Sequence, residues 1–179
     1  MKICARMMAV LLLTATTACA AEPDKSVTWL DDMSAAKAEA RKSGKAILAD
    51  FTGSDWCGWC IKLDKEVFSQ KAFLDYASSS LVLFKADYPR KTKLSAAVVK
   101  QNKALLITYR VEGFPTVLLL DAEGAVLAQT GYRQGGAEAY VDSLKGSLAK
   151  AGWTPAAVGV TIPPEKAGAA PGAAVPAAK

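Results

Sequence analysis

The stretch Trp56-Cys57-Gly58-Trp59-Cys60 places two cysteines two residues apart, shortly after the apolar run 46–51 (Ala-Ile-Leu-Ala-Asp-Phe). A short, bounded apolar run predicts a buried strand, and downstream of it Cys60, Leu63 and Val67 recur on one helical face. The pair is therefore expected where a strand passes into a helix. Unpaired N–H groups at a helix start favour the thiolate of Cys57, while Cys60 lies one turn deeper. Because the thiolate is the form that attacks disulfides, the pattern predicts thiol–disulfide exchange.

Two other uses of a cysteine pair fit the sequence less well. A zinc site needs four ligands, commonly Cys and His, but the chain has no His, and Cys4 and Cys19 lie in a segment that we expect to be processed. A structural disulfide that closes so small a loop restricts the unfolded chain little. We therefore expect neither a metal nor another cofactor.

The composition indicates one domain with tails. The chain has 179 residues, of which 51% are hydrophobic, and a formal charge of +5. Its Lys and Arg residues are interleaved with Asp and Glu, which is typical of a solvated surface and argues against a nucleic-acid partner. The basic cluster 90–93 is interpreted as a solvated loop.

Residues 1–20 have the features of an export signal. Lys2 and Arg6 give a positive start, residues 7–13 are apolar but too few to span a bilayer, and Ala18-Cys19-Ala20 is a small-residue cleavage site of the A-x-A kind. Cleavage before Ala21 would leave Cys57 and Cys60 as the remaining cysteines.

A lipoprotein signal ending at residue 18 is the alternative, because residues 16–19 resemble a loose lipobox in which Cys19 would be lipidated. Thr16 stands where Leu is usual in that motif. Both routes predict a periplasmic or secreted protein in an oxidising compartment, anchored to a membrane only if Cys19 carries lipid.

Helices and strands alternate in the predicted domain. Asp31 or Asp32 is expected to cap the first helix, and Ser69 is expected to cap a continuation of the helix that follows the cysteines. In the helix expected over 95–109, the side chains expected to be buried include Ala97, Val98, Leu105 and Tyr109. Helices are expected over 29–43, 60–68, 71–77, 95–109 and 137–151, and strands over 46–51, 81–87, 116–120 and 125–128.

This element order predicts an α/β fold with a central mixed four-stranded sheet flanked by helices. Early strands separated by helices favour parallel pairing, and the late hairpin adds an antiparallel edge. We divide the chain into an export signal (1–20), a leader (21–28), one domain (29–153) and a disordered Ala/Pro-rich tail (154–179).

Over residues 29–151 the chain resembles the thioredoxin superfamily. Besides the cysteine pair after a strand, Val111-Glu112-Gly113-Phe114-Pro115-Thr116 is similar to the family segment that holds a cis-proline opposite the active disulfide. The late hairpin with Gly124 and the closing helix also agree. Residues 50–60 resemble secreted bacterial thioredoxin-like proteins and the carboxy-terminal domain of DsbD, whereas thioredoxin itself has Gly-Pro where this chain has Gly58-Trp59.

The resemblance implies a set of site residues. Asp50 lies near the place of the family's buried aspartate, but one residue further from the first cysteine, so it is either a proton acceptor or a solvated strand-end carboxylate. Asp55 would raise the pKa of Cys57 if it faced the sulfur. The catalytic candidates are Cys57, Cys60, Pro115 and Asp50, and the substrate-binding candidates are Trp56, Gly58, Trp59, Phe114, Pro115 and Thr116.

The two tryptophans have two interpretations. They either pack structurally or flank the site, in which case we expect Trp56 to cover the sulfur pair and Trp59 to be partly exposed.

The expected function is that of an exported thiol–disulfide oxidoreductase. It would act as a monomer on protein substrates that carry disulfides or dithiols, and a membrane redox partner would reset its cysteine pair. The residues do not decide between reductase and oxidase. The alternative is a non-catalytic thioredoxin-fold binding or assembly module of the cell envelope, which would not need both cysteines.

Overall fold

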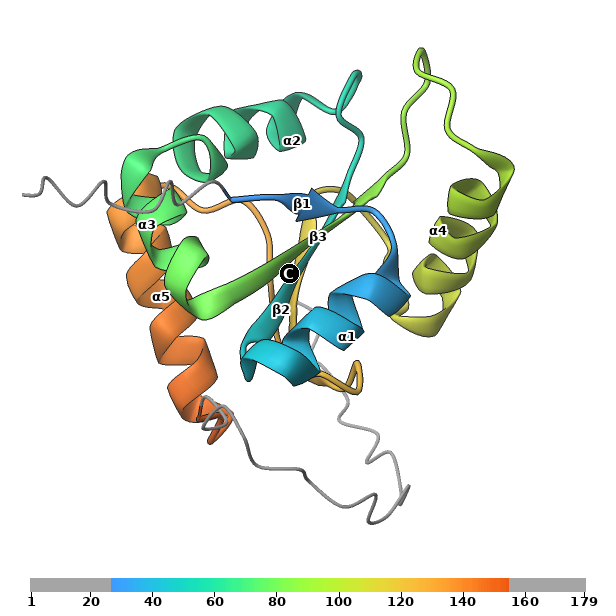
Figure 1. Ribbon diagram of the computed structural model, residues 1–179. Coiled ribbons are helices and arrows are strands. Elements are labelled where there is room, and N and C mark those ends of the chain that lie inside the picture. Colours follow the sequence, from blue (N-terminus) through green and yellow to red (C-terminus); the bar gives the residue numbers. More distant parts are fainter. Residues whose placement is uncertain (1–26, 155–179) are drawn as a thin grey trace, which may run out of the picture.

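The computed structural model describes residues 27–154, and within them five strands form one mixed sheet in the order β1-β3-β2-β4-β5 (Figure 1). The expected export signal, most of the leader and nearly all of the expected tail lie outside the described residues. The strands are β1 (Trp29–Leu30), β2 (Ala46–Thr52), β3 (Leu81–Asp87), β4 (Thr116–Leu120) and β5 (Val126–Thr130).

The pairing follows the predicted topology. β2 runs parallel to β3, and β4 runs antiparallel to both β2 and β5. The expectation of four strands is wrong, because Trp29 and Leu30, expected at the start of a helix, pair in parallel with Leu83 and Phe84 as β1. Two residues are too few to show a period-2 pattern, so this edge strand leaves no recognisable signal in the sequence.

The helices are α1 (Met33–Ser43), α2 (Gly58–Leu63), the π-helical turn η1 (Asp64–Phe68), α3 (Lys71–Ser80), α4 (Ala96–Thr108) and α5 (Gly136–Lys150). Asp32 is the N-cap of α1, and its carboxylate accepts from the Ser34 N–H at 2.8 Å. Ser69 is not a cap, because Gln70 precedes α3 and the Ser69 hydroxyl instead lies 3.4 Å from the Asp64 carboxylate.

The sheet separates two apolar clusters. Side chains of α2, η1, α3 and α5 pack on one face, and side chains of α1 and α4 pack on the other. Figure 1 shows α1 and α4 on a different side of the sheet from α3 and α5. β2 is buried along its whole length because it lies at the centre of the sheet between these layers. This burial on both faces explains why the sequence of β2 is an almost continuous apolar run rather than an alternation of apolar and polar residues.

α4 covers its face more loosely than its sequence predicts. Ala97 is exposed, and Val98, Leu105 and Tyr109 are only half-buried. The buried residue of this helix is Asn102, whose side-chain amide donates to the Asp87 carbonyl at 2.9 Å. A polar side chain therefore anchors α4 to the end of β3.

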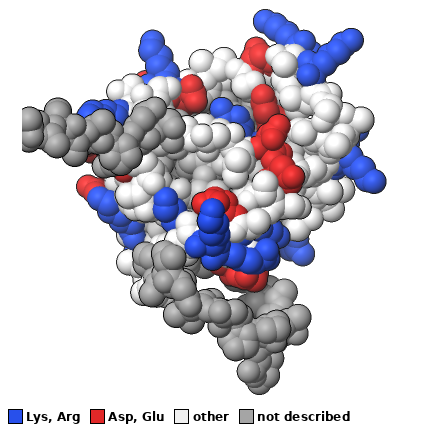
Figure 2. Space-filling model, in the orientation of Figure 1, with Lys and Arg blue, Asp and Glu red and all other residues white. Residues whose placement is uncertain are grey.

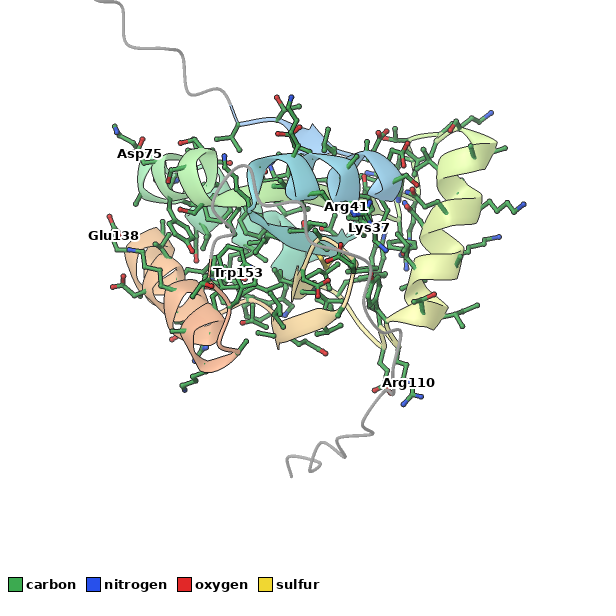
Figure 3. The ribbon with its side chains drawn as sticks, turned by 60° about the horizontal axis from the view of Figure 1, so that its bottom comes forward. Lys37, Arg41, Asp75, Arg110, Glu138 and Trp153 are labelled. Atoms are coloured by element: carbon green, nitrogen blue, oxygen red, sulfur yellow. A yellow bond between two sulfur atoms is a disulfide. The ribbon has the colours of Figure 1, made fainter. Side chains whose placement is uncertain are left out.

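At the other end of the sheet, α1 holds the β4–β5 turn. Lys37 and Arg41 lie side by side on α1 (Figure 3). The Lys37 ammonium donates to the Glu123 carbonyl at 2.9 Å, and the Arg41 guanidinium contacts the Glu123 carboxylate at 3.3 Å. The Tyr109 hydroxyl donates to the Gly124 carbonyl at 3.1 Å.

Within residues 27–154, no helix is long and apolar enough to cross a membrane.

Candidate active site

The loops that follow β2 and β3 emerge side by side at one end of the sheet (Figure 1). Parallel neighbouring strands end at the same edge, so these two loops are neighbours although their residues are far apart in the chain. Ser54 joins the first loop to the end of β3, because its N–H and hydroxyl donate to the Asp87 carboxylate at 2.9 and 2.6 Å.

Cys57 and Cys60 form a disulfide at the start of α2. Cys57 is the N-cap residue, and its sulfur accepts from the Cys60 N–H at 3.3 Å. Cys57 is 7% exposed and Cys60 is 4% exposed, so the two residues are buried to nearly the same extent. What distinguishes them is position, because Cys57 lies at the positive end of the helix dipole and Cys60 lies within the first turn.

The segment 111–116 lies next to Cys57, as predicted. The Phe114–Pro115 peptide bond is cis, and the Thr116 hydroxyl donates to the Gly113 carbonyl at 2.7 Å where β4 begins. A hollow of about 490 Å³ is lined by Trp56, Cys57, Leu106, Val111, Glu112, Gly113 and Phe114. Sequence reasoning did not assign Leu106, Val111 and Glu112 to the site, although the last two belong to the quoted motif.

The two tryptophans have different surroundings. Trp56 is 36% exposed, its indole N–H donates to the Tyr88 carbonyl at 2.8 Å, and its ring meets Phe114 edge-on at 6.0 Å between centroids. Trp59 is 57% exposed and packs on Tyr132 at 5.1 Å. Trp56 therefore belongs to the hollow, whereas Trp59 lies on the outer side of α2.

Two glycines around the cysteines differ in the space they leave. A Cβ atom on Gly53 would lie 2.5 Å from the Trp56 indole, so Gly53 makes room for that ring. A Cβ atom on exposed Gly58 would meet nothing within 4 Å. The structure thus brings together Trp56, Cys57 and Phe114, while Gly58 and Trp59 lie outside the lining of the hollow.

Asp50 is buried, so its interpretation as a solvated strand-end carboxylate is wrong. By the alternation of β2 it faces the same side as Leu48, which clusters with Leu63 of α2. Burial raises the pKa of Asp50 to about 7, although Lys85 nearby favours the charged form. Among residues 27–154, neither the Asp50 Oδ1 nor the Tyr140 hydroxyl on α5 has a hydrogen-bond partner.

The Asp55 carboxylate binds the loop after β3. It accepts backbone N–H groups of Arg90, Lys91 and Thr92 at 2.9, 2.7 and 3.2 Å. These hydrogen bonds, that of Arg90 foremost, hold the pKa of Asp55 below its usual value. The side chains of cluster 90–93 are solvated as predicted, but the backbone is attached to the cysteine loop, which the sequence did not indicate.

Metal binding has no candidate ligand set in the part of the chain that the structure describes, because no three His, Cys, Asp or Glu side chains there lie close enough together to hold an ion.

Known proteins share this arrangement. Residues 33–144 match the family model of the thioredoxin-like domain. The chain is 37% identical to the disulfide bond reductase DsbH of Chlamydia pneumoniae over 61% of this chain and 66% of that protein. It is 32% identical to the thiol:disulfide interchange protein DsbD of Vibrio cholerae, but it covers only 14% of that protein.

A solved structure of a DsbH oxidoreductase superposes with a TM-score of 0.67 at 31% identity, over 76% of this chain and 95% of that one. The match therefore extends over nearly the whole chain of that solved structure. By contrast, the chain spans 66% of the length of the DsbH protein of Chlamydia pneumoniae and a smaller part of DsbD.

Proposed function

Because the chain belongs to the thioredoxin-like domain family, we propose that it is a thiol–disulfide oxidoreductase that exchanges disulfides with protein substrates through Cys57 and Cys60. The observation that carries this proposal is the Cys57–Cys60 disulfide at the N-terminus of α2, with Cys57 in the wall of an apolar hollow. The similarity to a disulfide bond reductase supports reduction as the working direction.

In that direction the reduced pair acts in two steps. The Cys57 thiolate attacks one sulfur of the client disulfide, the client S–S bond breaks, and the departing client sulfur takes up a proton. Cys60 then loses its proton and attacks the Cys57 sulfur, which releases the second client sulfur and forms the Cys57–Cys60 disulfide. The client gains two electrons, the pair loses two, and a dithiol-bearing redox partner must return them.

The helix start and the buried carboxylate have separate roles in this scheme. Free N–H groups at the start of α2 stabilise negative charge on Cys57, which makes it the attacking residue. Asp50 faces the side of the sheet that α2 covers, and a pKa of about 7 suits a group that takes up and returns a proton near neutral pH. Asp50 is therefore the proposed proton acceptor for Cys60.

Client binding is assigned to the surface around Cys57. Trp56 and Phe114 supply apolar contact in the hollow, and Gly58 and Trp59 supply exposed surface beside the cysteines. The backbone next to Pro115 and Thr116, where β4 begins, pairs with an extended client segment as the family resemblance implies.

The proposed location is the periplasm or the outside of the cell, in keeping with the signal-like residues 1–20. The mature protein then starts at Ala21 or at a lipidated Cys19, and the mass of the protein isolated from the envelope distinguishes the two.

Single serine variants test the exchange mechanism. Cys60→Ser should trap mixed disulfides with clients, because the first attack survives and the resolving attack is lost. Cys57→Ser should trap few. The complexes are isolated under non-reducing conditions and should collapse when dithiothreitol is added.

Insulin reduction with dithiothreitol provides the second measurement. The wild type should exceed the background rate, and the double serine variant should not. Equal rates for the two proteins would favour a non-catalytic binding or assembly module of the envelope. More trapping by Cys57→Ser than by Cys60→Ser would reverse the assignment of attacking and resolving cysteine.

A further inference from the structure

The loop 88–93 is held firmly beside the cysteine pair. Asp55 accepts three of its backbone N–H groups, and the Trp56 indole donates to the Tyr88 carbonyl at its start. The ring of Tyr88 also stacks on Phe114 at 5.0 Å between centroids. A loop bound at both the cysteine side and the Phe114 side is pre-positioned, so its side chains lose little further freedom when a partner binds.

The cations of this loop are exposed and form no ion pair in the part of the chain that the structure describes, although the Asp55 carboxylate is close enough to Lys91 to interact with its charge. These cations are Arg90, Lys91 and Lys93. The nearby carboxylates are occupied, since Asp55 accepts from the loop backbone and Asp87 accepts from Ser54. Figure 2 shows Lys and Arg side chains gathered where the loops of Figure 1 emerge beside α4.

Arg90 links this positive charge to the hollow. Its guanidinium carbon lies 3.9 Å from the centroid of the Trp56 ring, and Trp56 lines the hollow together with Cys57. A guanidinium stacked on an aromatic face keeps its N–H groups directed sideways, where they can bind a carboxylate in bidentate fashion. The acidic side chain on the lining of the hollow is Glu112, which would repel a carboxylate placed inside.

We propose that the loop 88–93 selects clients in which an acidic residue lies next to the reactive cysteine, with an apolar client side chain in the hollow and the carboxylate on Arg90. Lys91 and Lys93 extend the attraction to longer acidic segments and increase the rate of encounter. This inference rests on the proposed function and names the client chemistry that the same site prefers.

Two matched disulfide peptides test the inference. They have equal length and the same apolar residue, and they differ only in Asp or Lys beside the cysteines. For the wild type we expect kcat/KM for the acidic peptide to be about fivefold higher or more at low ionic strength. The difference should shrink as salt is added, because exposed charges are screened.

The double variant Arg90→Gln/Lys91→Gln should bring the ratio of the two kcat/KM values close to one. The matched control is Lys42→Gln/Lys150→Gln, which removes the same net charge from the last turns of α1 and α5. Figure 1 shows these helix ends away from the two loops. The control should keep the wild-type ratio, which separates a local effect from that of net charge.

The outcomes distinguish this inference from the function on which it rests. If the wild type reduces neither peptide, the proposed function itself fails. If it reduces both with equal kcat/KM, or if the control variant loses the preference as much as the loop variant does, exchange stands and the assignment of the loop is overturned.

Discussion

At the scale of single residues, the Asp50 carboxyl group is the clearest case of a side chain whose chemistry depends on its surroundings. It lies in the central strand of the sheet and is 3% exposed. Burial disfavours its charged form, and Lys85 only partly opposes this effect. The raised pKa makes the stability of the fold depend on pH.

Replacing Asp50 with Asn should remove this dependence. The pKa of Asp50 is about 7 in the folded protein, against an ordinary value of 3.8 for an exposed aspartate. Between these values the folded state binds the proton more tightly than the unfolded chain does, so stability falls as the pH rises. Asp50→Asn should therefore gain stability relative to the wild type with rising pH, reaching about 2–4 kcal/mol above pH 7.

Urea unfolding of the oxidised proteins at pH 4 and pH 8 measures this difference. Asp31→Asn, a change on the exposed surface, is the control and should follow the wild type at both pH values. The measured quantity is the difference in free energy of unfolding between Asp50→Asn and the wild type. If this difference is the same at both pH values, the assignment of a raised pKa to Asp50 is contradicted.

At the scale of elements, the β4–β5 turn is held by hydrogen bonds from α1 and from the end of α4. Lys37 reaches the Glu123 carbonyl, and Tyr109 reaches the Gly124 carbonyl. Gly124 has a φ of 92°, which side chains of L-residues rarely adopt, and a Cβ atom there would lie 2.9 Å from the Tyr109 hydroxyl oxygen. The turn is thus restricted by its backbone and by its neighbours.

Gly124→Ala should destabilise the protein by about 1–2 kcal/mol, because the left-handed conformation becomes strained and Lys37 and Tyr109 must move. Gly146→Ala is the matched change, since Gly146 lies inside α5 and a Cβ atom there meets nothing within 4 Å. It should stabilise the protein by about 0.5–1 kcal/mol. Thermal unfolding of both variants checks the opposite signs, and a loss of stability in Gly146→Ala as large as that in Gly124→Ala would contradict this account.

At the scale of the whole molecule, α5 closes one apolar layer, and the residues just after it take part in the packing. Leu144 and Leu148 of α5 are buried, and Trp153 packs against the same cluster. The Trp153 N–H also donates to the Leu148 carbonyl at 3.0 Å. The packed part of the chain therefore reaches at least to Trp153.

Two truncations locate this boundary. Removal of residues 155–179, an Ala/Pro-rich stretch without apolar periodicity, should change the free energy of unfolding by less than about 0.5 kcal/mol. Removal of 153–179 should cost about 1–3 kcal/mol, because the Trp153 ring leaves the cluster. Denaturant unfolding compares the two, and equal stabilities would mean that Trp153 contributes nothing.

What the sequence by itself determined are the features encoded in a few neighbouring residues. The apolar run of β2, the place of the cysteine pair between a strand and a helix, the order of the elements from α1 onward and the β4–β5 hairpin were all predicted correctly. Each depends on local periodicity, caps or turn residues, and these act over one or two turns of chain.

Only the tertiary structure decided the pairing of β1, the burial of Asp50, the loose packing of α4 and the attachment of the loop 88–93 to Asp55. Asp50 could have been solvated or buried, because the spacing of residues along β2 does not reveal what covers the strand. The Asp55 carboxylate binds an N–H group 35 residues away. Such contacts form because the topology brings distant segments to one edge of the sheet, and a local sequence pattern does not indicate which segments will meet there.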